Sequence, residues 1–83
     1  MEIEAAIREL EGKEKDTRFA RLLNICTSVF GSPRISGSHH IFKMPWQGHP
    51  QANLQAQKGK AKPYQVRQVL ECLKKYEEQN AKT

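Results

Sequence analysis

The stretch Ser36-Gly37-Ser38-His39-His40-Ile41-Phe42-Lys43-Met44-Pro45 decides the fold. Gly37 and Ser38 predict a turn, and residues 39–44 predict a strand that Pro45 ends. A short candidate strand at residues 33–36 precedes the turn. Residues 52–57 alternate apolar with polar side chains, the period of a strand with one buried face. The pattern therefore predicts three short antiparallel strands.

Apolar residues at helical spacing predict helices on both sides of these strands. We expect helices over residues 2–11, about 17–29 and about 63–78, the first ended by Gly12 and the second capped by Asp16 or Thr17. Pro63 suits the first position of the last helix. The predicted apolar stripes are Ile3, Ala6, Ile7 and Leu10, then Phe19, Leu22, Leu23, Cys26 and Phe30, and finally Val66, Val69, Leu70 and Leu73.

The order helix, helix, three strands, helix predicts an α+β fold of two layers. Two amphipathic helices would cover one face of a three-stranded antiparallel sheet, and the other face would remain open to solvent or a ligand. The 83 residues fit one domain. We expect residues 1–15 to form a helical N-terminal extension and residues 16–83 to form the domain itself.

The charge of the chain is strongly uneven. Residues 1–32 carry five basic and six acidic side chains, whereas residues 33–83 carry nine basic and three acidic ones. No Asp or Glu occurs from Pro33 to Leu70. Such a one-signed stretch attracts a polyanion, although an ordinary solvated basic face is the alternative. The cations of this stretch are Arg34, Lys43, Lys58, Lys60, Lys62 and Arg67.

His39 is the candidate for chemistry. Alternate strand residues point to opposite faces, so Phe42 and Met44 share a face with His40, while Ile41 and Lys43 share one with His39. We expect the more hydrophobic set, Phe42 and Met44, to face the helices, which leaves His39 on the open face. The alternative buries Ile41 instead.

A histidine can serve a ribonuclease without a metal. An imidazole has an ordinary pKa of about 6.5, so it can accept a proton from a ribose hydroxyl and donate one to a leaving oxygen near neutral pH. RNA supplies its own nucleophile, and nearby cations can stabilise the charge on the phosphate. A solvated surface histidine without a catalytic role is the alternative for His39.

Other polar and aromatic residues have plainer interpretations. His40 is expected on the inner face of its strand, and His49 in a loop, where phosphate contact is less expected than solvation. Trp46 and Tyr64 could stack on unpaired bases, but packing is the favoured interpretation for Tyr64. The three histidines match no zinc spacing. Cys26 and Cys72 belong to no C-x-x-C pair and are expected to be buried thiols.

Two segments resemble the HicA toxins. Residues 36–42 resemble their Gly-Ser-His strand motif, and residues 53–55 and 58–70 resemble the third strand, basic turn and last helix of one HicA-like subgroup. The resemblance covers about residues 17–78. It implies a fold similar to the double-stranded-RNA-binding domain, with one helix, three antiparallel strands and one helix.

The resemblance also implies a function. It implies a toxin of a type II toxin–antitoxin system, an endoribonuclease that cleaves mRNA without metal or cofactor and is neutralised by a HicB-type antitoxin. The expected location is the cytoplasm, because the acidic N-terminus lacks the long apolar run of a signal peptide. His39, directly after Gly37 and Ser38, is then the catalytic residue. RNA would be bound by Ser38, Lys43, Lys58, Lys60, Lys62 and Arg67.

Two features depart from that family. Residues 1–15 are not explained by its motif, and Gln57-Lys58 stand where many HicA proteins carry a further histidine. Two alternatives to the toxin remain. One is a non-catalytic RNA-binding module of the same fold, and the other is a protein-interaction domain whose basic face docks an acidic partner. No segment is apolar enough to predict a membrane span.

Overall fold

The sheet is built from three short strands, as the sequence predicts. The computed structural model describes residues 2–43, 52–56 and 58–81 of the chain. Strands β1 (Arg34–Ser36), β2 (His39–Phe42) and β3 (Ala52–Leu54) pair antiparallel in the order β1-β2-β3. In this register Ser36 lies opposite His39 and Ile41 opposite Asn53. The turn from β1 to β2 needs Gly37, whose φ of +61° is in the left-handed region.

Strand β3 is shorter than the predicted range of 52–57. It ends at Leu54 because the next backbone N–H, that of Gln55, donates to the Gln65 side chain at 3.3 Å instead of continuing a ladder. The predicted Met44 end of the second strand lies outside the described residues. The part of that strand that is described ends at Phe42.

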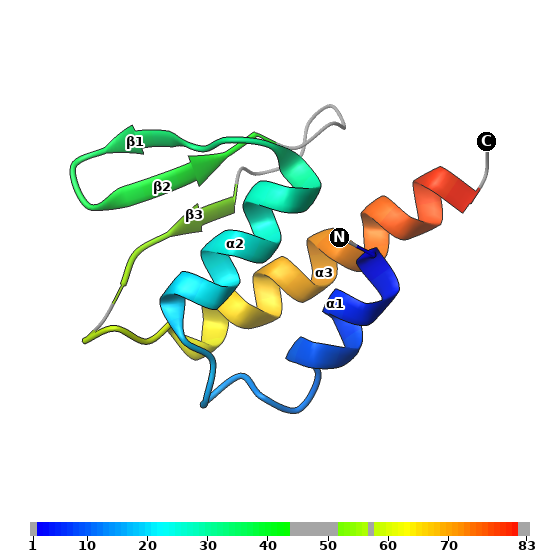
Figure 1. The fold of residues 1–83 in the computed structure, drawn as a ribbon, viewed down its shortest axis with the longest axis horizontal. Coiled ribbons are helices and arrows are strands. Elements are labelled where there is room, and N and C mark those ends of the chain that lie inside the picture. The colour runs from blue at the N-terminus through cyan, green and yellow to red at the C-terminus, as the bar shows by residue number, and fades with distance from the viewer. Residues whose placement is uncertain (1, 44–51, 57, 82–83) are drawn as a thin grey trace.

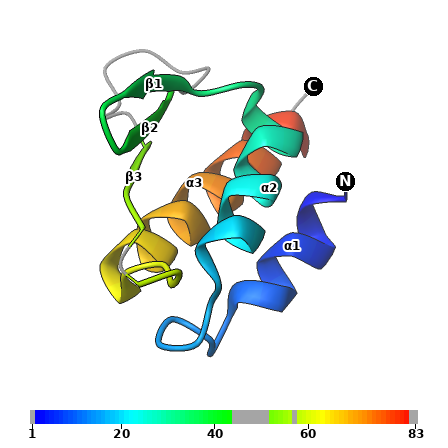
Figure 2. The ribbon, with the colours of Figure 1, turned by 60° about the vertical axis from the view of Figure 1, so that its left-hand side comes forward.

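Three helices lie on the same side of the sheet. They are α1 (Ile3–Leu10), α2 (Phe19–Phe30) and α3 (Pro63–Ala81). Figures 1 and 2 show the sheet on one side of the molecule and α1 on the side of α2 and α3 that is away from it. The chain is therefore α+β with the order α-α-β-β-β-α, and α3 extends beyond the predicted end at residue 78. Of the described helices, none is both long and apolar enough to cross a membrane.

The predicted cap of the second helix is wrong. Helix α2 begins at Phe19, its N-cap is Arg18, and no side chain caps it. Thr17 instead donates its hydroxyl to the Lys13 carbonyl at 2.6 Å, and its own carbonyl accepts from the Ala61 N–H at 2.9 Å. Residues 17–18 are therefore held extended by pairing with the turn before α3, and this tertiary contact overrides the local capping preference.

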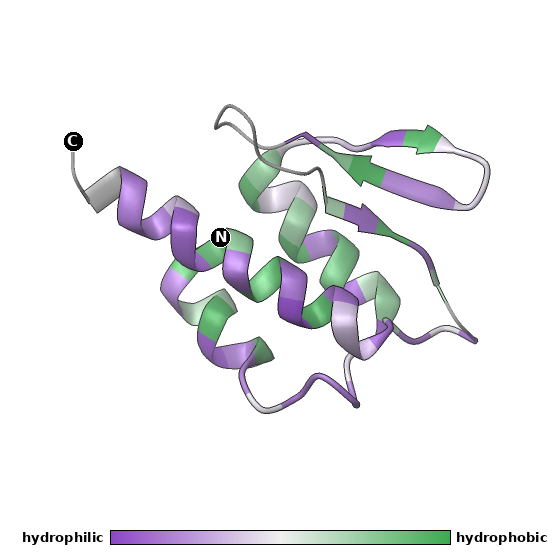
Figure 3. Ribbon diagram, turned by 180° about the vertical axis from the view of Figure 1, so that it is seen from behind, coloured by the Kyte–Doolittle hydropathy of each residue, from purple (hydrophilic) through white to green (hydrophobic). Residues whose placement is uncertain are grey.

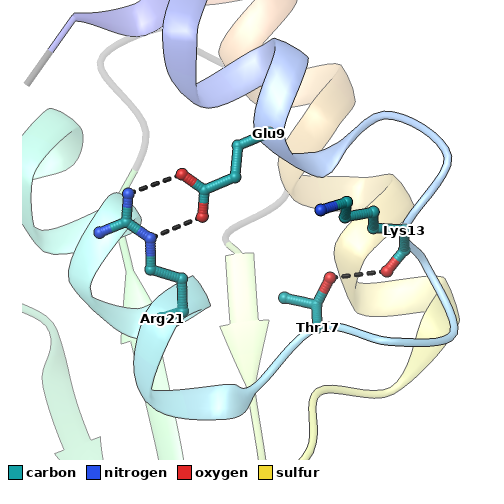
Figure 4. Close-up of polar contacts among 4 residues, drawn as sticks. All are labelled: Glu9, Lys13, Thr17 and Arg21. Carbon is teal, nitrogen blue, oxygen red and sulfur yellow. Dashed lines mark hydrogen bonds and ion pairs between the residues drawn. The ribbon is translucent and has the colours of Figure 1, made fainter.

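Helix α1 is part of the hydrophobic core. Ala6, Ile7 and Leu10 are buried, and the helix packs on α3. Figure 4 shows how α1 is also fastened to α2, where both oxygens of Glu9 accept hydrogen bonds of 2.6 Å from the Arg21 guanidinium. This hydrogen bond is the main cause that holds the pKa of Glu9 below its usual value. Residues 3–10, within the predicted N-terminal extension, are thus helical and packed on the rest of the chain.

The predicted apolar stripes form the core. All of their members are buried or packed against the buried cluster, and Ile25, which the second stripe omits, is fully buried too. Figure 3 shows hydrophobic and hydrophilic residues along each helix, as expected for helices buried on one side. Phe42 is only 1% exposed while Ile41 is half-buried, so the expected orientation of β2 is confirmed and its alternative is wrong.

The two thiols are buried where α2 and α3 pack, as predicted. Burial, with a smaller contribution from Cys72, raises the pKa of Cys26 to about 12, and burial also raises the pKa of Cys72. Both are free cysteines. Because the thiolate is the reactive form, neither residue is suited to nucleophilic chemistry.

Candidate functional site

His39 lies on the face of the sheet that is turned away from the helices. It begins β2 directly after the Gly37-Ser38 turn and is half-buried. Its neighbour His40 points the other way and meets the Phe19 ring edge-on, with 5.3 Å between the ring centroids. The alternation along β2 therefore separates a packed histidine from an accessible one, as the sequence predicts.

A hollow of about 250 Å³ opens beside His39 at the edge of the sheet formed by β3. It lies between β3 and the first turns of α3, and we call it the His39 hollow. None of the described side chains that line it carries a fixed charge, since they are one imidazole, four amides and one phenol. They are His39, Asn53, Gln55, Tyr64, Gln65 and Gln68.

Asn53 holds the His39 ring. The His39 Nδ1 and the Asn53 Oδ1 are 3.0 Å apart, across the pair of strands β2 and β3. An amide oxygen only accepts, so the contact is a hydrogen bond in the tautomer that carries the imidazole proton on Nδ1. Nε2 is then the nitrogen with a free lone pair, and it is the one available to take a proton from a ligand.

The base of the hollow is fixed by amides. Gln65 is 1% exposed, and its oxygen accepts from the Gln55 N–H at 3.3 Å. With the amide oriented to satisfy both partners, its nitrogen also donates to the Gln55 carbonyl at 3.2 Å. The Gln55 side chain in turn donates to the Ser38 hydroxyl at 2.9 Å. This chain of contacts ties the turn before His39 to β3 and α3.

The predicted cations do not line the His39 hollow. Lys43 lies four residues beyond His39, which is about 13 Å at strand spacing, and it lines a second hollow with Ser32, Arg34 and Ile41. Lys58 and Lys60 line a third, with Arg18, Asp16 and Gly59. Arg67 is exposed on α3 and Lys62 is half-buried just before that helix. Lys43 and the pair Lys58 and Lys60 therefore belong to two separate basic hollows. Of the predicted RNA-binding residues, Ser38 is the one joined to the lining of the His39 hollow, through Gln55.

The basic turn is rigidly placed. The Phe19 N–H donates to the Gly59 carbonyl at 3.1 Å, and Arg18 and Lys60 form a single antiparallel bridge. Lys60 also approaches Asp16, with 3.9 Å between Nζ and Oδ1, but both side chains are exposed and such pairs contribute little. Arg18, which the sequence interpretation did not include, thereby joins Lys58 and Lys60.

Sequence reasoning missed most of the hollow. Asn53, Gln55, Gln65 and Gln68 were not predicted as site residues, and the favoured packing of Tyr64 is wrong because its side chain is 55% exposed. One signal was available, since the period-two pattern of residues 52–57 places Asn53 and Gln55 on the polar face. Trp46 and His49 lie outside the described residues.

The described residues offer no group of three or more His, Cys, Asp or Glu that could hold a metal ion. The comparisons with known proteins give no further guide. No family model matches the chain, and no curated protein and no solved structure matches it either.

Proposed function

We propose that this chain is a HicA-type toxin, a metal-independent endoribonuclease that cleaves mRNA in the cytoplasm and so inhibits translation. The observation that carries the proposal is the 3.0 Å contact between His39 and Asn53, which orients an accessible imidazole on the open face of the sheet. The order of helices and strands around that face is compatible with a fold like the double-stranded-RNA-binding domain over residues 16–83. Helix α1 packs on that domain from the side away from the sheet.

The proposed reaction uses the hydroxyl of the RNA as its nucleophile. His39 Nε2 removes the proton of a 2′-hydroxyl, and the 2′-oxygen forms a bond to the adjacent phosphorus. The bond from phosphorus to the 5′-oxygen breaks, and the leaving oxygen takes a proton from the imidazolium or from water. The products are a 2′,3′-cyclic phosphate and a free 5′-hydroxyl. Among the described residues that line the hollow there is no carboxylate, so the imidazole is the group there that can act as a general base.

The basic patches would bind the phosphates on either side of the cleaved bond. Lys43 lies at one end of the open face, and Lys58 and Lys60 lie on a turn fixed to the start of α2. Such contacts position the strand without reading its sequence. We expect Lys62 and Arg67, near the beginning of α3, to contribute in the same way.

The test is cleavage of single-stranded RNA by the purified chain in EDTA. The proposal expects cuts that leave 2′,3′-cyclic phosphates, and it expects a 2′-deoxy substitution at the cut position to block them. RNA that stays intact, or products with 3′-hydroxyl ends, would contradict the mechanism.

One observation favours a second candidate, a non-catalytic RNA-binding module. The cations lie in patches away from His39 rather than around it, so RNA could be bound without an activated phosphate at the imidazole. In that case His39→Ala changes affinity and no cleavage is found in the unmodified chain.

A HicB-type antitoxin is the proposed protein partner, and we expect it to cover the His39 face. Hydrogen exchange of the chain with and without its antitoxin would test this. Protection of β2 and the first turns of α3 is the expected result, whereas a complex that leaves both regions unprotected would contradict direct blocking.

A further inference from the structure

The His39 hollow differs in chemistry from the other hollows of the open surface. Two others contain Arg34 and Lys43, or Arg18, Lys58 and Lys60 beside Asp16, and their net positive charge suits phosphates. The His39 hollow contains amides and a phenol instead. Each amide presents one hydrogen-bond acceptor beside two donors, which matches the edge of a nucleobase better than it matches an anion.

Two of these side chains can present a group to a ligand: Tyr64 its exposed ring, although its hydroxyl lies 3.4 Å from the Gln65 amide nitrogen, and Gln68 its amide. Among the residues that the structure describes, the Gln68 amide has no hydrogen-bonding partner, although it lines the hollow and is half-buried. Tyr64 is 55% exposed and lies four residues earlier in α3, so both side chains project from the same face of the helix. An exposed ring beside a free amide is the arrangement by which proteins stack on an unpaired base and read its edge.

The remaining amides act differently. Gln65 is buried and committed to the backbone of Gln55, and Gln55 donates to Ser38. These contacts shape the hollow rather than bind a ligand. The hollow, at about 250 Å³, is smaller than the roughly 300–1,000 Å³ of sites for drug-sized molecules, and it therefore suits one planar ring system.

We propose that the His39 hollow binds one unpaired nucleobase, stacked on Tyr64 and read by Gln68, and that it thereby selects the phosphodiester bond that is cut. The selection of the cut bond rests on the proposed ribonuclease function, whereas the binding of the base does not. Because His39 lines the same hollow, the ribose of the bound nucleotide comes next to the imidazole. The basic patches bind RNA without sequence preference, and the hollow adds a preference at one nucleotide.

The first experiment maps the cuts made in a random single-stranded RNA in EDTA. The unmodified chain should prefer one nucleotide at the cut, and Gln68→Ala should reduce that preference by about 5- to 100-fold, the range for loss of a paired amide contact. Gln79→Ala is the matched control, since it removes an exposed glutamine from the far end of the same helix. Equal cutting at all nucleotides, or a preference that survives Gln68→Ala, would overturn the inference.

The second experiment needs no cleavage. A single-stranded 2′-deoxy oligonucleotide with one 2-aminopurine reports stacking by loss of fluorescence. Tyr64→Phe should keep the fluorescence change, because phenylalanine keeps the aromatic ring. Tyr64→Leu removes the ring and should weaken binding of the labelled base by about 10-fold.

Together the two experiments distinguish a failure of the proposed base-binding hollow from a failure of the proposed ribonuclease function. Tyr64-dependent binding without any cleavage would support the hollow and reject the ribonuclease. Cleavage that neither Tyr64→Leu nor Gln68→Ala redirects would support the ribonuclease and reject the hollow. Binding of the labelled base that is indifferent to Tyr64→Leu would reject the hollow whether or not RNA is cut.

Discussion

The contact between His39 and Asn53 offers the sharpest prediction about the proposed chemistry. Asn53→Leu removes the acceptor for His39 Nδ1 and keeps a side chain of similar size. Asn53 is exposed, so the variant should still fold. A hydrogen bond of this kind contributes about 0.5–1.5 kcal/mol net. At about 1.4 kcal/mol for each factor of ten, the rate of cleavage should fall by about 2- to 12-fold.

Asn53→Asp separates orientation from mere packing. A carboxylate beside His39 favours the imidazolium, so the pH at which cleavage reaches half of its maximum should rise, by up to about one unit. The assay is the rate of cleavage of a labelled single-stranded RNA in EDTA, measured between about pH 5 and pH 9. If Asn53→Leu cleaves at the unmodified rate and Asn53→Asp leaves the pH profile in place, Asn53 does not position the catalytic ring.

Three further predictions concern stability and RNA binding. Leu10→Ala should lower the free energy of unfolding by about 2–5 kcal/mol in urea titrations, because Leu10 is 1% exposed, and a loss near zero would mean that α1 is not part of the core. Glu9→Gln should destabilise the chain at pH 7 but not in strong acid. The lowered pKa of the Glu9 carboxyl means that its ionised form stabilises the folded chain above pH about 4.5, and that this stabilisation is lost as the pH falls through the lowered pKa. An equal loss of stability at both pH values would refute the ion pair between Glu9 and Arg21. RNA affinity should fall about 50-fold between 50 and 200 mM salt if about four phosphates are neutralised, as by Lys58, Lys60, Lys62 and Arg67. An affinity that does not change with salt would refute the proposal that these cations bind the phosphates.

Much of the fold could be read from periodicity. The three helical stripes and the period-two strands depend on which side chains are buried, and burial is what the apolar pattern encodes. The orientation of β2 followed from the same rule, because Phe42 and Met44 make a more hydrophobic set than Ile41 and Lys43. The boundaries of the helices and strands could be predicted less well from the sequence. The ends of α2 and β3 are set by Thr17 and Gln55, whose hydrogen bonds reach to residues far along the chain.

Only part of the candidate site could be predicted from the sequence. His39 could be placed on the open face from alternation alone, and the resemblance to HicA toxins gave it a role. The amides around it could not be found in that way, since Gln65 and Gln68 enter the site only through the packing of α3 beside β3. The charge pattern predicted cations near the chemistry, whereas the folded chain places them in patches around a neutral hollow.

The most direct test of the proposed function compares the unmodified chain with His39→Ala for both cleavage and binding of one single-stranded RNA in EDTA. The account predicts that His39→Ala loses cleavage by a factor of about 10² or more, the usual contribution of a positioned acid or base, while its RNA affinity stays close to that of the unmodified chain. Equal cleavage by the two proteins would contradict the account, because it would place the chemistry at another residue or in a contaminant.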